Sequence, residues 1–267
     1  MELFRYATSV YGQKVLLGAS WSLFWWFVGA AAAFIVLDII GRAVLSAPHA
    51  PADAASDGGR VTRHLLVDRL YHWTMAASVL TLLFTAFAPI LGWKFEWLTV
   101  HWCAGVVLAV LVLIHIVRAS FWQDFWAMMV VPADLRLALQ ALRRGGVTER
   151  PGKYPLLQKL YHWAIAAIVL AMVVTGLLML LKIDTPLWRR NPYWFADSTW
   201  GVIYAVHDLC AMATLALVAA HIYMAVRPDK FWITRSMFSG WITRRDYLAH
   251  HDPARWAASE GEDRGRA

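Results

Sequence analysis

Residues 156–181 read LLQKLYHWAIAAIVLAMVVTGLLMLL, an apolar run that carries one lysine and one histidine, His162. A helix needs about 20 apolar residues to cross the hydrocarbon core of a bilayer, which is about 30 Å thick. This run is long enough, and similar runs occur elsewhere in the chain. They are approximately Trp21–Leu45, Leu70–Gly92, Leu98–Ala119 and Trp200–Val226. The sequence therefore predicts an all-α integral membrane protein with five spans.

The composition excludes the main alternatives. Of the 267 residues, 60% are apolar and 16% are charged, against about 45–50% and about 25% in average soluble domains. Too few polar residues remain for a soluble enzyme, and the same values exclude intrinsic disorder. Cys103 and Cys210 lie in apolar runs, so no disulfide framework is predicted. The first run exceeds the about 7–15 residues of a signal peptide core, so we expect it to be a permanent span.

The basic residues predict the orientation in the membrane. When the spans alternate, 19 of the 25 Lys and Arg residues fall on one side. Positively charged loops stay in the cytoplasm, so this side is cytoplasmic, with the N-terminus outside and the C-terminus inside. The net charge of +7 is then explained by topology, and no nucleic-acid partner is expected.

Spans two and three recur as spans four and five. Leu70-Tyr-His-Trp73 returns as Leu160-Tyr-His-Trp163 with an offset of 90, and His101 and His115 return as His207 and His221 with an offset of 106. We expect a four-helix bundle of two hairpins related by a pseudo-two-fold axis along the membrane normal, plus one extra helix. The predicted segments are 1–69 (first span and linker), 70–126 (first hairpin), 127–155 (cytoplasmic connector), 156–232 (second hairpin) and 233–267 (cytoplasmic tail).

Six of the ten histidines lie in the spans, where ionisable side chains are costly and usually functional. They are His72, His101, His115, His162, His207 and His221. A spacing of 14 residues places two imidazoles on one face of a helix, one near each membrane surface. Zinc sites need ligands close together, usually with Cys or carboxylate, whereas two imidazoles suit the iron of a haem in a bundle core. Covalent attachment is not expected, because the sequence has no Cys-x-x-Cys-His.

The six histidines fall into two groups by their expected depth in the membrane. His101 and His207 lie near the external ends of their spans and are expected to share one haem. The other four lie toward the cytoplasmic side, where they can hold one haem or two.

Four stretches together resemble a known family. They are Arg69-Leu-Tyr-His-Trp73, His101-Trp-Cys-Ala-Gly105, the segment from His207 through His221-Ile-Tyr-Met-Ala225, and the tail from Phe238 to Trp256. The chain resembles, over about residues 65–256, the cytochrome b (gamma) subunits of membrane-bound formate dehydrogenases, in the bacterial di-haem cytochrome b561 and hydrogenase-cytochrome group.

The resemblance implies haem b between His101 and His207 on the external side, and between His72 and His221 on the cytoplasmic side. It implies a bacterial inner-membrane subunit that does not oxidise the primary substrate itself. Electrons would arrive from an iron–sulfur subunit fed by a molybdenum or tungsten catalytic subunit. They would leave to a quinone near the cytoplasmic face, and Gln158 falls in the region of the quinone site.

His115 and His162 depart from that pattern. The pseudo-two-fold operation converts the pair His72–His221 into His162–His115, which predicts a third haem. The alternatives are pairing within hairpins, His72–His115 and His162–His221, or hydrogen bonds to a quinone or a propionate.

The sequence is also compatible with other partners and functions. The partner can instead be a hydrogenase or a thiosulfate or sulfite oxidoreductase, and the chain can be a stand-alone b561-type reductase or a metal or proton transporter. Arg69 and Lys159 are candidates for haem propionates or membrane anchoring, and Asp208 either orients an imidazole or faces external water. The remaining histidines are expected to be solvated loop residues: His49, His64, His250 and His251.

Overall fold

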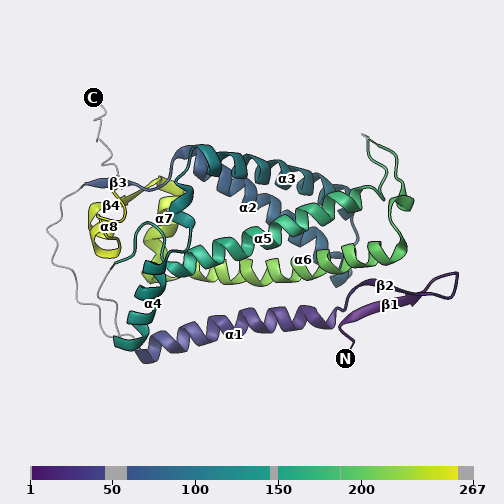
Figure 1. The fold of residues 1–267 in the computed structure, drawn as a ribbon, viewed down its shortest axis with the longest axis horizontal. Helices are drawn as coiled ribbons and strands as arrows, with labels where there is room; N and C mark the ends of the chain where they lie inside the picture. Colours follow the sequence, from purple (N-terminus) through teal and green to yellow (C-terminus); the bar gives the residue numbers. More distant parts are fainter. Residues whose placement is uncertain (1, 46–58, 145–149, 187, 258–267) are drawn as a thin grey trace. The chain divides into compact units, whose positions relative to one another are not determined.

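The computed structural model describes residues 2–45, 59–144, 150–186 and 188–257 (Figure 1). Within this part of the chain, five helices are long and apolar enough to cross a membrane. They are α1 (Ser22–Leu45), α2 (Leu66–Phe87), α3 (Trp97–Phe121), α5 (Leu156–Leu180) and α6 (Asp197–Val226). Only 6–28% of the residues in their apolar windows are buried in the protein, which leaves most of the apolar surface for lipid. The predicted all-α membrane fold with five spans is confirmed.

The helix ends differ from the predicted ones by a few residues. α2 begins at Leu66, four residues before the predicted start, and ends at Phe87. A short 3-10 helix, η1 (Pro89–Leu91), follows it and is closed by Gly92, whose φ of 89° favours glycine. α6 begins at Asp197, whose carboxylate suits the positive end of a helix.

The chain divides into two compact units. The first unit contains residues 1–42, 74–116 and 165–221. Here α2, α3 and α5 pack through Leu82, Leu108 and Val169, each at most 8% exposed. The hydroxyl of Thr214 on α6 lies 3.5 Å from the sulfur of Met172 on α5. The first unit therefore contains segments of the four repeated helices in mutual contact.

A β-hairpin in the first unit was not predicted. Strands β1 (Phe4–Thr8) and β2 (Lys14–Ala19) are antiparallel and pack on α6. A Cβ atom at Gly201 would lie 2.2 Å from the Leu16 carbonyl oxygen, so only glycine fits there. The carboxylate of Asp208 accepts a hydrogen bond from the amide of Ala19 at 3.1 Å and lies 3.7 Å from the guanidinium of Arg5. Asp208 therefore holds the hairpin, a role that the sequence analysis did not foresee.

The second unit contains residues 43–73, 117–164 and 222–267. Strands β3 (Arg60–Thr62) and β4 (Trp241–Thr243) pair antiparallel, and Val61 and Ile242 form a small core with Tyr247. Short helices complete this unit: η2 (Phe125–Met128), α4 (Pro132–Arg144), η4 (Pro228–Lys230), α7 (Phe231–Ser239) and α8 (Arg244–His250). A further short helix, η3 (Pro192–Trp194), belongs to the first unit. Of the predicted linker 46–68, residues 46–58 lie outside the described part, and the rest contains β3 and the start of α2.

Candidate functional site

His101 on α3 and His207 on α6 lie close together in the first unit. Their ring centres are 6.4 Å apart, with the ring planes inclined by 66°. A metal–imidazole bond is about 2.0 Å long and each ring centre lies about 1 Å beyond its nitrogen, so two imidazoles on opposite sides of one metal ion have centres about 6 Å apart. The pair predicted for the external haem is therefore brought together at a separation that fits axial ligation.

Each of these imidazoles contacts a threonine from the preceding helix of its hairpin. The Thr85 hydroxyl lies 2.8 Å from Nδ1 of His101, and the Thr175 hydroxyl lies 2.9 Å from Nδ1 of His207. These threonines are not among the site residues predicted from the sequence. They are separated by 90 residues, the same offset as the two Leu-Tyr-His-Trp motifs, and this shared offset is the signal that identifies them.

The two copies of the motif lie in the second unit, and each holds the segment that follows the other hairpin. The indole of Trp73 donates a hydrogen bond to the carbonyl of Met237 on α7 at 3.2 Å. The indole of Trp163 donates to the carbonyl of Met128 in η2 at 3.0 Å. These contacts fix the helix turns that carry His72 and His162. The copies therefore exchange equivalent contacts, as expected of a pseudo-two-fold pair.

The basic residue that precedes each copy of the motif donates to the carbonyl directly after the one that the tryptophan binds. Arg69 donates to the carbonyl of Phe238, and Lys159 donates to the carbonyl of Met129 at 3.0 Å. Lys159 also forms an ion pair with Asp134 of α4 at 2.7 Å, with both side chains less than 10% exposed. Lys159 thus has a carboxylate partner within the protein, whereas the sequence suggested a haem propionate or membrane anchoring for this lysine.

The sequence model of the prokaryotic cytochrome b561 family matches residues 63–240. The chain belongs to this family. It is also 26% identical over 226 residues to the formate dehydrogenase cytochrome b556 subunit of Haemophilus influenzae, an alignment that covers 77% of this chain and 85% of that protein. The resemblance found in the sequence is confirmed, and the protein is a membrane b-type cytochrome.

The residues around His101 and His207 fit the haem b that membership of the cytochrome b561 family implies. Two neutral imidazoles are the donor set of a bis-histidine haem iron. Across the described part of the chain, no group of three or more His, Cys, Asp or Glu side chains is placed to hold a bare metal ion. The histidine pair suits haem b, whose porphyrin would bind the iron together with the two imidazoles.

The remaining intramembrane histidines of the cytochrome are divided between the units. His115 on α3 and His221 on α6 belong to the first unit, whereas His72 on α2 and His162 on α5 belong to the second. Their pairings stay predictions. Gln158 lies half-buried in the first turn of α5, directly before Lys159.

A buried arginine organises the tail of the cytochrome. Arg63 is 4% exposed and lies between the rings of Trp232 and Trp256, at 5.6 Å and 5.4 Å from their centres. Its guanidinium contacts Nε2 of His251 at 3.0 Å, while Nδ1 of His251 donates to the carbonyl of Gly152 at 2.8 Å. The imidazole of His251 therefore accepts from Arg63 in its neutral form.

The solvated environment expected for the tail histidines is wrong for His251, which is 3% exposed. Burial, together with the charge of Arg63, lowers the pKa of His251 to about 4. Burial and the charges of Arg63 and Lys153 lower the pKa of His64 to about 3. His250 is exposed and stacks on Trp232, with ring centres 4.7 Å apart. His49 lies outside the described residues.

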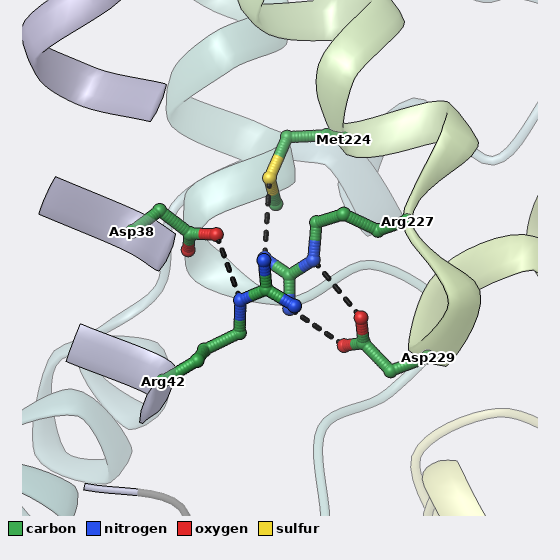
Figure 2. Close-up of polar contacts among 5 residues, drawn as sticks. All are labelled: Asp38, Arg42, Met224, Arg227 and Asp229. Carbon is green, nitrogen blue, oxygen red and sulfur yellow. Dashed lines mark hydrogen bonds and ion pairs between the residues drawn. The ribbon is translucent and has the colours of Figure 1, made fainter. Parts of the chain in front are cut away.

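Charged side chains at two span ends pair locally (Figure 2). On α1, Arg42 contacts Asp38 one turn earlier at 3.0 Å. After α6, Arg227 binds Asp229 through two nitrogens, at 3.0 Å and 2.6 Å, and also contacts the sulfur of Met224 at 3.3 Å. The hydrogen bonds from Arg227 lower the pKa of Asp229. These two arginines are thus neutralised within their own segments.

Proposed function

We propose that this cytochrome is a membrane-anchoring electron-transfer subunit that links an extracytoplasmic dehydrogenase of the formate dehydrogenase type to the quinone pool. The observation that carries the proposal is the close pair His101 and His207, held by Thr85 and Thr175. Haem b, when bound there, supplies reversible one-electron chemistry at its iron. The imidazoles of His101 and His207 would hold the haem iron.

A second haem is proposed between His72 and His221. The repeat supports this pairing, because each proposed ligand has a counterpart in the other hairpin. The same operation produces His162 with His115, the proposed third pair. The number of haems per chain decides between two sites and three.

The partners follow from the relative. The Haemophilus influenzae protein is named as a subunit of formate dehydrogenase, so we propose that this chain associates with an iron–sulfur subunit and a molybdenum or tungsten catalytic subunit. The proposed location is the bacterial inner membrane, with the N-terminus periplasmic and the C-terminus cytoplasmic. Quinone is proposed to bind near the cytoplasmic face, in the region of Gln158.

Pyridine haemochrome quantitation against protein tests the haem sites. We expect His101→Ala and His207→Ala each to lose the same single haem, while the exposed His250→Ala keeps the full complement. His115→Ala and His162→Ala each lose one further haem if the third site exists. A wild-type chain with two haems eliminates the third site, and a His101→Ala variant with the full complement eliminates the first.

The partner assignment has a separate test. Purification of the complex in mild detergent is expected to yield iron–sulfur and molybdenum or tungsten subunits, with reduction of the haems by formate. Haem reduction by ascorbate in a chain that purifies alone would instead favour the stand-alone reductase. A chain without a Soret band would favour the transporter.

A further inference from the structure

Thr85 and Thr175 occupy equivalent places in the repeat. Each lies 13 residues after the motif histidine of its own helix, His72 on α2 and His162 on α5. Thr85 is 1% exposed and Thr175 is 8% exposed, so both hydroxyls are removed from solvent. Both contact Nδ1 of a histidine on the next helix, as described above.

The hydrogen of each hydroxyl is already used. Thr85 donates to the carbonyl of Thr81 at 2.8 Å, and Thr175 donates to the carbonyl of Ala171 at 2.7 Å. A hydroxyl has one hydrogen and two lone pairs, so toward the histidine it acts as the acceptor. Nδ1 of each imidazole therefore carries the proton. In a neutral imidazole the other nitrogen, Nε2, then keeps its lone pair.

We propose that Thr85 and Thr175 are positioning residues for the haem of His101 and His207. Each threonine fixes the tautomer and the orientation of one imidazole, so that Nε2 is the nitrogen available to the iron. An acceptor on Nδ1–H also makes the imidazole a more basic ligand, which favours ferric over ferrous iron. This inference rests on the proposed function, because it assumes that these histidines are the axial pair.

A third buried threonine shows that the contact to histidine is a separate feature. Thr214 on α6 is 0% exposed and donates to the carbonyl of Cys210 at 2.8 Å, as Thr85 and Thr175 donate to their own helices. Its other contact is the sulfur of Met172. No imidazole of the described residues is found in contact with the Thr214 hydroxyl, so Thr214 has the same burial and backbone bond without that contact and provides a matched control.

The experiment uses the full chain loaded with haem in detergent. Thr85→Val and Thr175→Val remove the hydroxyl with little change of volume, Thr85→Ser and Thr175→Ser keep it, and Thr214→Val controls for the loss of a buried hydroxyl. We measure haem retention, the potential of each haem by spectroelectrochemical titration, and the low-spin ferric signal by electron paramagnetic resonance.

We expect each Thr→Val change beside a histidine to weaken haem retention by about 10–100-fold, the usual effect of losing a partner of a metal-bound histidine. At a fixed ambient potential, the ferrous-to-ferric ratio of one haem is expected to rise by about 2–10-fold, as for one lost hydrogen bond. The serine variants restore the wild-type values, and Thr214→Val matches the wild type.

Two results overturn the inference. It is rejected if Thr85→Val and Thr175→Val do not differ from Thr214→Val in haem retention, potential and ferric signal. It is also rejected if the serine variants fail to restore a haem that the valine variants lose. His101→Ala and His207→Ala are measured in parallel. If these retain all haems, the proposed haem site is wrong; if they lose one haem while the valine variants behave as wild type, only the role of the threonines is wrong.

Discussion

The two copies of the Leu-Tyr-His-Trp motif make the same backbone contacts but balance their charges differently. In each copy the tryptophan and the preceding basic residue bind two consecutive carbonyls of the segment after the other hairpin. At the second copy, Lys159 also pairs with the buried Asp134. At the first copy, no ion pair of Arg69 is found among the described residues.

This difference indicates which contacts of a repeated motif are kept when the side chains of the two copies differ. A carbonyl acceptor is present at every residue, so a contact to the backbone survives when the acceptor's own side chain changes. A contact to a carboxylate needs one particular side chain in one place. Asp134 meets that need at the second copy, where it also accepts a hydrogen bond from the amide of Val131 at the start of α4.

The largest effect is expected from breaking the ion pair at the second copy. Lys159→Met leaves the Asp134 carboxylate buried without its cation, which costs about 3–5 kcal/mol. Arg69→Met at the first copy removes a hydrogen bond to a carbonyl that is exposed to solvent, where the charge of the guanidinium is screened, so it is expected to cost about 0.5–1.5 kcal/mol. The free energy of unfolding in detergent, followed by circular dichroism, measures both.

A double variant serves as the control for this prediction. Lys159→Met with Asp134→Asn removes both charges, so it is expected to recover part of the stability lost in the single variant. Equal losses for Lys159→Met and Arg69→Met would mean that the charge difference between the copies has no energetic consequence.

Much of this architecture could be predicted from the sequence. The five spans follow from apolar length, because a bilayer demands about 20 apolar residues per helix. The pair His101 and His207 follows from the offset of 106, since equivalent residues of two hairpins related by an axis lie at the same depth. The apolar length of a span involves many residues, and the histidine spacing occurs twice, so both features leave a clear pattern in the sequence.

The rest depends on contacts that leave little pattern. Strands β3 and β4 have three residues each and are distant in sequence, so alternation cannot identify them. His251 was expected in solvent because a tail rich in charge usually is, but it is buried against Arg63 and Trp232 from other segments and against Trp256 of the tail itself. Thr85 and Thr175 share the offset of 90 residues, but only the assembled helices show that each contacts a histidine.

Acidification provides the next test. Two histidines with a lowered pKa, His64 and His251, lie beside Arg63, which belongs to the segment that precedes the first copy of the motif. The pKa of His251 is about 4 in the folded protein and about 6.5 when unfolded. Between these values the unfolded state binds more protons, so stability falls as the pH falls from about 6.5 to about 4 and is unaffected above that range.

The thermal midpoint between pH 4 and pH 8 measures this effect. Protonation of His251 in the folded protein would remove the acceptor of its hydrogen bond from Arg63. A hydrogen bond with a charged group contributes about 1.5–3 kcal/mol, so acidification is expected to lower the free energy of unfolding by about this amount. His251→Gln does not titrate and is expected to give a flatter profile. A wild-type midpoint that is constant over this range, or a His251→Gln profile as steep as the wild type, would contradict the buried neutral state of His251.

The smallest effects are expected where the copies are alike. Trp73→Phe and Trp163→Phe each remove one indole hydrogen bond to a carbonyl, at 3.2 Å and 3.0 Å in the native protein, so each is expected to cost about 0.5–1.5 kcal/mol. Both side chains are partly exposed, at 42% and 39%, so little apolar burial is lost with the indole. The two losses should agree within the error of the detergent unfolding measurement. A clear difference between them would show that the backbone contacts have diverged along with the charges, because equal geometry would then no longer produce equal stabilisation.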